Sequence, residues 1–235
     1  LDNTNGLLLG LTRGQMQGVM APYVRYIALA EREWAQTQRY SGNAERSVCW
    51  VSREREFRGR RCMDTRMLDT LSRGRPGSLE EPVNRFVSPG AMTVAVPVGM
   101  FFNPLRMDRA EIDRLGAEAV ALTHGAPQAF LVGAALAHMI SRIIWDGADD
   151  LKELVKETAE TLQESFGREY RQVAEVRDGL NMALRLADSH NVSCSEAMEH
   201  LRCTTMPEIL AEYPEACIYI AGNSIVEDHS LKDKI

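Results

Sequence analysis

The sequence predicts an all-α protein, a multi-helix bundle of about eight to ten helices around one buried central helix. Three observations support this fold class. Apolar residues recur at helical spacing over most of the 235 residues, no segment alternates apolar and polar residues as a strand does, and residues 129–144 are almost wholly apolar. A helix that is apolar on all sides is buried on all sides, so this segment is predicted to be the centre of the bundle.

The central helix has a definite predicted start. Pro127 is tolerated in a first helical turn because the N–H that proline lacks has no partner there. Thr123, His124 and Gly125 interrupt the apolar sequence just before it. The free amides and the dipole of a helix N-terminus favour anions, and Thr123 and His124 are predicted to lie at such an end.

The N-terminal third contains an amphipathic helix and a short helix. Apolar spacing predicts them over residues 19–38 and 62–71, and the second ends before Gly74. The polar opening Asp2, Asn3 and Thr4 suits a helix N-cap and equally suits ligation of a hard cation by oxygen. The residues themselves do not choose between these two interpretations.

Residues 82–104 differ in composition from the predicted helices, with four prolines and two glycines among apolar residues. Residues 88–91 favour a tight turn. Residues 93–100 suit either a strand or a buried helical turn between loops, and Pro97 argues against the strand because proline cannot donate to a sheet.

The C-terminal half is predicted to be helical, and residues 1–235 are treated as a single domain. Apolar spacing indicates helices over residues 107–122, 149–166 and 169–187. Ser193 and Glu196 form a capping box that predicts another helix. A last helical pair is expected at residues 207–213 and 214–220, before a polar tail.

Composition limits the possible partners and the compartment. A net charge of −6 argues against broad nucleic-acid binding, which requires a basic face. The longest apolar run, residues 130–137, is far shorter than the roughly 20 residues that cross a bilayer, so no membrane partner is expected. Five cysteines without a CxxC pair indicate reduced thiols in a cytoplasmic protein. Because the chain begins with Leu1 and not Met, residues upstream are expected.

Several segments resemble motifs of the ADP-ribosylglycohydrolase superfamily, which includes ADP-ribosylarginine hydrolases and dinitrogenase-reductase-activating glycohydrolases. Residues 84–100 resemble the family's Asn- and Gly-rich loop with its Gly-Ala-Met segment, and residues 123–127 resemble its Thr-His-x-x-Pro motif. Residues 1–4 resemble the Thr-Asp-Asp-Thr metal motif, and residues 222–230 the C-terminal metal loop. The resemblance implies an orthogonal all-α bundle.

The resemblance also implies a metal site. Family members cleave the glycosidic bond of ADP-ribose with a pair of Mg²⁺ ions, for which Mn²⁺ is the expected substitute. Carried over to this sequence, the metal ligands are Asp2, Asn3 and Asp228, and the catalytic carboxylates are Asp2 and Asp228. The expected function is a Mg²⁺-dependent hydrolase that releases ADP-ribose from an arginine-like side chain or a related N-riboside.

The nucleotide is expected at the central motifs. By the resemblance, the backbone amides at Ser88, Gly90 and Ala91 would bind the diphosphate. Phe86 would lie against the sugar or the base, and His124 would meet the ribose. The expected partners are therefore ADP-ribose or an ADP-ribosylated protein.

Departures from the family motifs keep two other functions open. Asn3 stands where a second Asp is usual, and Thr93 where the family has Arg. A degenerate member that binds ADP-ribose or a protein partner without turnover would explain these losses. A helical scaffold without a small-molecule site is the third hypothesis, under which His124 is a structural histidine and Asp228 belongs to a solvated acidic tail.

Overall fold

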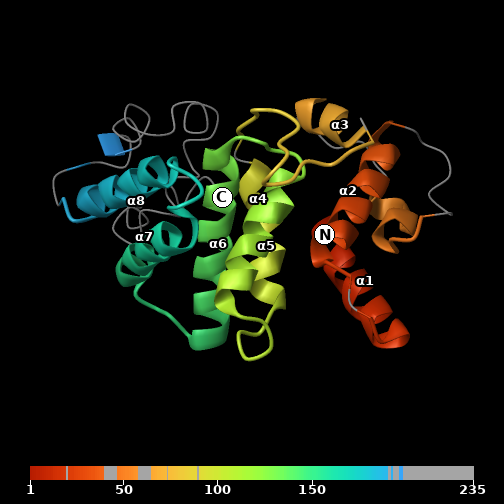
Figure 1. Ribbon diagram of the computed structural model, residues 1–235, viewed down its shortest axis with the longest axis horizontal. Coiled ribbons are helices and arrows are strands. Elements are labelled where there is room, and N and C mark those ends of the chain that lie inside the picture. Colours follow the sequence, from red (N-terminus) through yellow and green to blue (C-terminus); the bar gives the residue numbers. More distant parts are fainter. Residues whose placement is uncertain are drawn as a thin grey trace.

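The computed structural model describes residues 1–19, 21–39, 47–57, 65–72, 74–88, 90–189, 192 and 196–197. Within these residues every regular element is helical, which confirms the all-α prediction (Figure 1). Two short 3-10 turns, η2 and η3, follow α2. The helices are α1 (Asp2–Gln17), α2 (Tyr23–Arg39), α3 (Thr65–Ser72), α4 (Gly90–Phe101), α5 (Arg109–Ala121), α6 (Pro127–Asp146), α7 (Leu151–Phe166) and α8 (Val173–Ala187), and the 3-10 turns are Val51–Arg53 and Arg55–Phe57.

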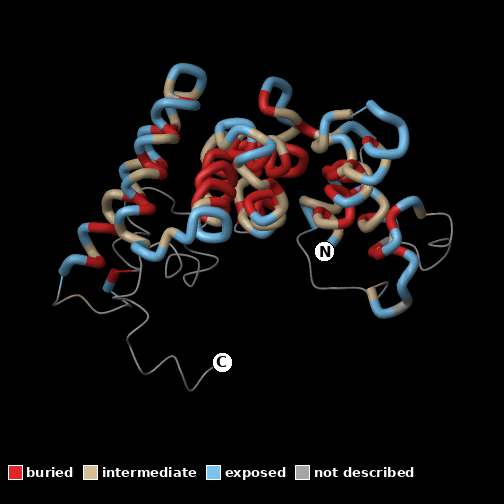
Figure 2. The backbone as a smooth tube through the Cα atoms, turned by 90° about the horizontal axis from the view of Figure 1, so that it is seen from below, coloured by how far each residue is buried: buried red, intermediate tan, exposed pale blue. Residues whose placement is uncertain are grey.

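Helix α6 is the predicted central helix, and it begins at Pro127 as expected. It packs against α4 and α5 on one side and against α7 and α8 on the other (Figure 1). Buried residues gather in the middle of the molecule, where these helices meet (Figure 2). The prediction of burial on all sides is wrong for the last turn, where Ile143, Ile144 and Trp145 are exposed, and in part for Leu136 and Ile140, which are only partly buried.

Helix α6 is also long and apolar enough to cross a membrane when judged by length and composition alone. Its 20 residues exceed the apolar run that the sequence analysis considered. In the structure, 61% of the apolar window is buried inside the protein, as expected of a core helix that passes the same test.

Helices α5 and α6 approach each other through glycines. A Cβ atom on Gly116 would lie 2.6 Å from the Ala137 Cβ, and one on Gly133 would lie 2.5 Å from the Val120 Cγ2. Both distances are shorter than van der Waals contact, so side chains at these positions would push the helices apart. The glycines therefore set the close packing at the centre of the bundle.

Residues 90–101 form the full helix α4, and not the strand or the single helical turn that the sequence allowed. Pro97 lies inside it and lacks the N–H that would bond to the carbonyl of residue 93. Val94, Val98 and Gly99 are buried against the bundle, and the Cβ position of Gly99 meets α6. Tertiary packing of the apolar helix therefore outweighs the helix-breaking effect of proline.

Helix α1 begins at Asp2, and Leu1 occupies its N-cap position without a side-chain hydrogen bond. The N-cap interpretation of Asp2, Asn3 and Thr4 is therefore wrong, because these residues form the first helical turn. Helix α1 was not predicted as a separate helix. It packs against α2, whose bounds lie close to the predicted range of residues 19–38.

The remaining predicted helices agree with α3, α5, α7 and α8 to within a few residues. Asp150 caps α7, because its side chain accepts hydrogen bonds from the backbone N–H groups of Lys152 and Glu153. The predicted capping box at residues 193–196, the helical pair at 207–220 and the tail with Asp228 lie outside the described residues, apart from residues 196–197.

Candidate functional site

A corner of buried polar residues joins the end of α5 to the start of α6. Thr123 and His124 have 0% exposure there. The two ring nitrogens of His124 are both engaged: Nδ1 lies 2.8 Å from the Thr123 Oγ1, and Nε2 lies 2.9 Å from the Ser88 Oγ. The imidazole is therefore held in one orientation from both sides.

Asn84 ties the segment before α4 to this corner. Its side-chain amide donates to the Thr123 carbonyl at 2.9 Å and to the Thr70 Oγ1 at 3.1 Å. Its Oδ1 accepts from the backbone N–H groups of Gly125 and Phe86, each at 2.9 Å. The side chain thus uses all four of its hydrogen-bonding positions. The sequence marks Asn84 as part of a motif but does not reveal this role.

Phe86 packs against two planar groups. Its ring stacks on the His124 imidazole, with 4.6 Å between the centroids and 18° between the planes. The guanidinium of Arg66, from α3, lies 4.0 Å from the ring centroid. The imidazole and the guanidinium thus both pack against the Phe86 ring. A sugar or base that stacked on Phe86 would therefore either share the ring with the Arg66 guanidinium or displace it.

The turn before α4 uses one of the amides expected to bind the diphosphate. The Ala91 N–H donates to the Ser88 carbonyl at 3.1 Å, so this amide serves the turn itself. Ser88 and Ala91 are buried, and Gly90, the first residue of α4, is exposed. Of these three residues, Gly90 is thus the one that is exposed.

The hydrogen bond between Ser88 and His124 brings two helix N-termini together. Ser88 comes two residues before the start of α4, and His124 comes three residues before the start of α6. The first amides of each helix have no partner within that helix, and both dipoles present their positive ends. This arrangement favours an anion near the corner.

A second polar cluster lies between α1 and α2. Asp2 is half-buried in the first turn of α1, Asn3 is buried beside it, and Glu31 of α2 is buried close to both. Burial raises the pKa of Glu31 to about 8, the side chain of Asn3 lowers that pKa, and the charge of Asp2 raises it further. The structure thus places the carboxyl group of Glu31 beside the expected metal ligands Asp2 and Asn3, and the sequence did not point to Glu31 as a ligand.

The neighbouring carboxylate Glu33 has a structural role. Its two oxygens accept hydrogen bonds from the backbone N–H groups of Val48 and Cys49, both at 2.8 Å. Burial, together with the charge and hydrogen bond of Glu33, raises the pKa of the Cys49 thiol to about 12. This thiol stays protonated at neutral pH and is not an activated nucleophile.

The two clusters belong to different parts of the bundle. Helix α1 contacts α4, and α2 contacts α3 and α5, so α1 and α2 pack on the side of the bundle that α4 and α5 form (Figure 1). Asp228 lies outside the described residues, so its meeting with Asp2 stays a prediction. Among the residues that the structure describes, no three His, Cys, Asp or Glu side chains form a metal-binding group.

A comparison with protein families gives the evolutionary relationship. The family model described as ADP-ribosylglycohydrolase matches residues 3–228. The chain belongs to the ADP-ribosylglycohydrolase family. This finding confirms the resemblance noted in the sequence, and it supports a hydrolase in general. Searches of curated proteins and of solved structures found no match.

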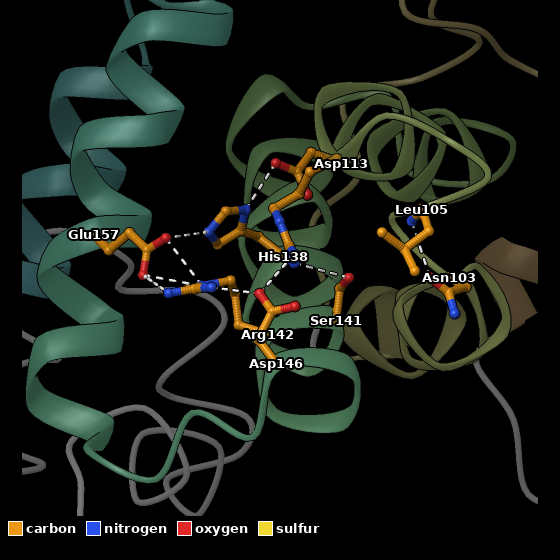
Figure 3. A network of polar contacts seen from close by, with 9 residues as sticks. Asn103, Leu105, Asp113, His138, Ser141, Arg142, Asp146 and Glu157 are labelled. Carbon is orange, nitrogen blue, oxygen red and sulfur yellow. Dashed lines mark hydrogen bonds and ion pairs between the residues drawn. The ribbon is translucent and has the colours of Figure 1, made fainter.

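This ADP-ribosylglycohydrolase family member has another buried histidine, His138, deep in α6 (Figure 3). Its Nδ1 is hydrogen-bonded to the Asp113 carboxylate at 2.9 Å, and its Nε2 lies 3.8 Å from the Glu157 Oε1. Arg142 links Glu157 to Asp146. At about 1.5 Å per residue, His138 lies about 16 Å along the axis from the start of α6, so it does not belong to the His124 corner.

Proposed function

We propose that this family member is a Mg²⁺-dependent hydrolase that cleaves the glycosidic bond between ADP-ribose and an arginine-like protein side chain, or a related N-riboside. The observation that carries the proposal is the contact between Ser88 and His124. This contact joins two helix N-termini beside the family's Thr-His-x-x-Pro motif, which suits a diphosphate.

The electrostatics support an anionic ligand at this place. Each helix N-terminus contributes about 0.3–1 kcal/mol to the binding of a negative charge, and more where the site is partly buried. The chain as a whole carries a charge of −6, so attraction of a diphosphate has to be local. The exposed Gly90 at the start of α4 offers its backbone amide for this purpose.

In this proposal His124 is a positioning residue. Both of its nitrogens are already bonded, and its ring is fully buried, so it acts through Ser88 and Phe86 and does not move a proton itself. Phe86 keeps its role against the sugar or base, with Arg66 as the group that the ligand meets first.

The proposed metal ligands are Asp2, Asn3 and Asp228. Carboxylate and amide oxygens suit Mg²⁺, which usually keeps several waters, and Asp2 is only half-buried. A bound ion would activate a water for attack on the anomeric carbon. The carboxylates of Asp2 and Asp228 would stabilise the positive charge that develops on the ribose.

The test is release of ADP-ribose from an ADP-ribosylated arginine peptide, followed with Mg²⁺, with Mn²⁺ and with EDTA. We expect release with either metal and none with EDTA. Ser88→Ala should weaken ADP-ribose binding, because it removes the hydroxyl that joins the two helix N-termini. Absence of release with both metals would contradict the proposed activity.

A second candidate is a family member that binds ADP-ribose without turnover. The observation in its favour is Asn3, an amide at a position where the family has a carboxylate. This function predicts binding of ADP-ribose in calorimetry with no release of product. Activity gained by Asn3→Asp alone would show that the site had lost only one ligand.

A further inference from the structure

The packing of α1 on α2 places the start of α1 beside the middle of α2. A Cβ on Gly10 would meet the ring of Tyr23, and a Cβ on Gly6 would meet the backbone of Ile27. From Gly10 to Gly6 the contact moves four residues toward the start of α1, and from Tyr23 to Ile27 it moves four residues toward the end of α2. The two helices therefore run antiparallel. The next step sets Asp2 opposite Glu31.

Glu31 is a buried carboxylate whose hydrogen bonds are not satisfied. It is 2% exposed, and neither carboxylate oxygen has a partner at hydrogen-bond geometry among the described residues, although the Asn3 amide is near enough to act on it. Glu33, two residues further on, has an N–H donor on each oxygen. A buried polar group without hydrogen-bond partners is costly, so the two unpartnered oxygens of Glu31 beside Asp2 require an explanation.

We propose that Glu31 is a cation ligand, which with Asp2 and Asn3 forms an oxygen site for a divalent metal and supplies the carboxylate that Asn3 lacks. This inference rests on the proposed metal-dependent function. The three side chains come from adjacent helices that face each other, and all three offer oxygen, the donor that Mg²⁺ and Mn²⁺ prefer. A cation would compensate the two unpaired oxygens of Glu31.

The site explains how this family member tolerates Asn3. With Glu31 as a ligand, the site has two carboxylates, Asp2 and Glu31. The family motif also has two carboxylates, both from Asp, so Glu31 would replace the charge that Asn3 lacks. Asp2 is half-buried while Glu31 is fully enclosed, so water would reach the ion from the side of Asp2. The prediction is thus a metal-binding role for Glu31, a residue of α2 whose position in the sequence lies outside both segments that resemble family metal motifs.

The experiment measures Mn²⁺ binding by electron paramagnetic resonance, and thermal unfolding with and without Mn²⁺, for the EDTA-treated full chain. In Glu31→Gln we expect Mn²⁺ binding to weaken by more than about tenfold, because even loss of a residue that only supports a ligand costs about 10–100-fold. Without metal, Glu31→Gln should unfold at the same or a higher temperature than the wild type, because a neutral amide of the same shape replaces a buried carboxyl group without hydrogen-bond partners.

Glu33→Gln is the matched control. It lies on the same helix and keeps only one of the two oxygens that accept from Val48 and Cys49, so it should unfold at a lower temperature and yet bind Mn²⁺ as the wild type does. A second variant tests the exchange of ligands: Asn3→Asp added to Glu31→Gln should restore Mn²⁺ binding.

The inference is overturned if Glu31→Gln binds Mn²⁺ as the wild type does, and the proposed hydrolase would then stand with a different ligand set. It is also overturned if the wild type binds no Mn²⁺. The release of ADP-ribose, measured separately, decides whether the proposed function fails with it.

Discussion

At the scale of single residues, one amide holds the His124 corner together. Asn84 makes four hydrogen bonds, to Thr70, Phe86, Thr123 and Gly125. These bonds tie α3, the segment before α4 and the α5–α6 junction to one another. The shape of the predicted ADP-ribose site therefore depends on a side chain that need not touch the ligand.

We predict that Asn84→Ala lowers the free energy of unfolding by about 2–4 kcal/mol, because it leaves several buried donors and acceptors without partners. Urea unfolding measures this loss. Asn103→Ala is the control, since the Asn103 side chain accepts only the N–H of Leu105 and should cost less than about 1 kcal/mol. Equal losses in the two variants would show that Asn84 has no special role in the corner.

The buried pair of Asp113 and His138 gives a prediction about pH. Burial raises the pKa of Asp113 above its ordinary value of 3.8, and the bond to His138 acts in the opposite direction. Because the pKa is higher in the folded state, Asp113 stabilises the fold fully below pH 3.8 and loses this contribution as the pH rises through the raised pKa.

We therefore expect Asp113→Asn to flatten the fall in stability that the wild type shows as the pH rises through the acidic range. The asparagine oxygen can still accept from the His138 ring, so the contact is kept. Urea midpoints at intervals from about pH 4 to pH 7 measure the effect. A variant with the same pH dependence as the wild type would contradict this account of the pair.

At the scale of elements, the bundle depends on how closely α5 and α6 approach. The space for a side chain at Gly133 is taken by a methyl group of Val120. We predict that Gly133→Ala and Val120→Ala each destabilise the protein by about 1–3 kcal/mol, the first by overpacking and the second by leaving a cavity.

The double variant should cost at least about 1 kcal/mol less than the two single losses together, because removal of the valine methyl makes room for the new one. Urea unfolding of the four proteins completes the cycle. Additive losses would mean that the Gly116 backbone, and not Val120, limits the approach of the helices.

At the scale of the whole molecule, ligand binding should raise the free energy of unfolding. A ligand that binds only the folded state adds about 2.7 kcal/mol at 100 times its dissociation constant. For a chain of this size, that corresponds to a rise of about 5–10 °C in the unfolding temperature. We expect ADP-ribose with Mg²⁺ to produce such a rise, measured by thermal shift.

AMP alone serves as the control for this experiment, since it lacks the diphosphate and should produce a smaller shift. An unchanged unfolding temperature at high ADP-ribose concentration would favour the helical scaffold over both proposals. A shift without release of product would favour the member that binds without turnover.

Local patterns were enough to predict most helices. Apolar spacing gave α5, α7 and α8 to within a few residues, and Pro127 marked the start of α6, because these signals depend on neighbours in the chain. Helix α1 was missed, and α4 was left undecided because Pro97 weakens any local prediction of regular structure. In α4 the burial of apolar side chains, which depends on other helices, decides the conformation.

By itself, the sequence determined the all-α class, the central helix and the motif that begins at Thr123. Tertiary structure alone decided that Ser88 bonds to His124 across 36 residues, that Asn84 joins three segments, and that Glu31 is buried opposite Asp2. The physical reason is the range of the interactions. Helix formation depends on residues a few positions apart, whereas the partners of a buried polar group are set by how the helices pack.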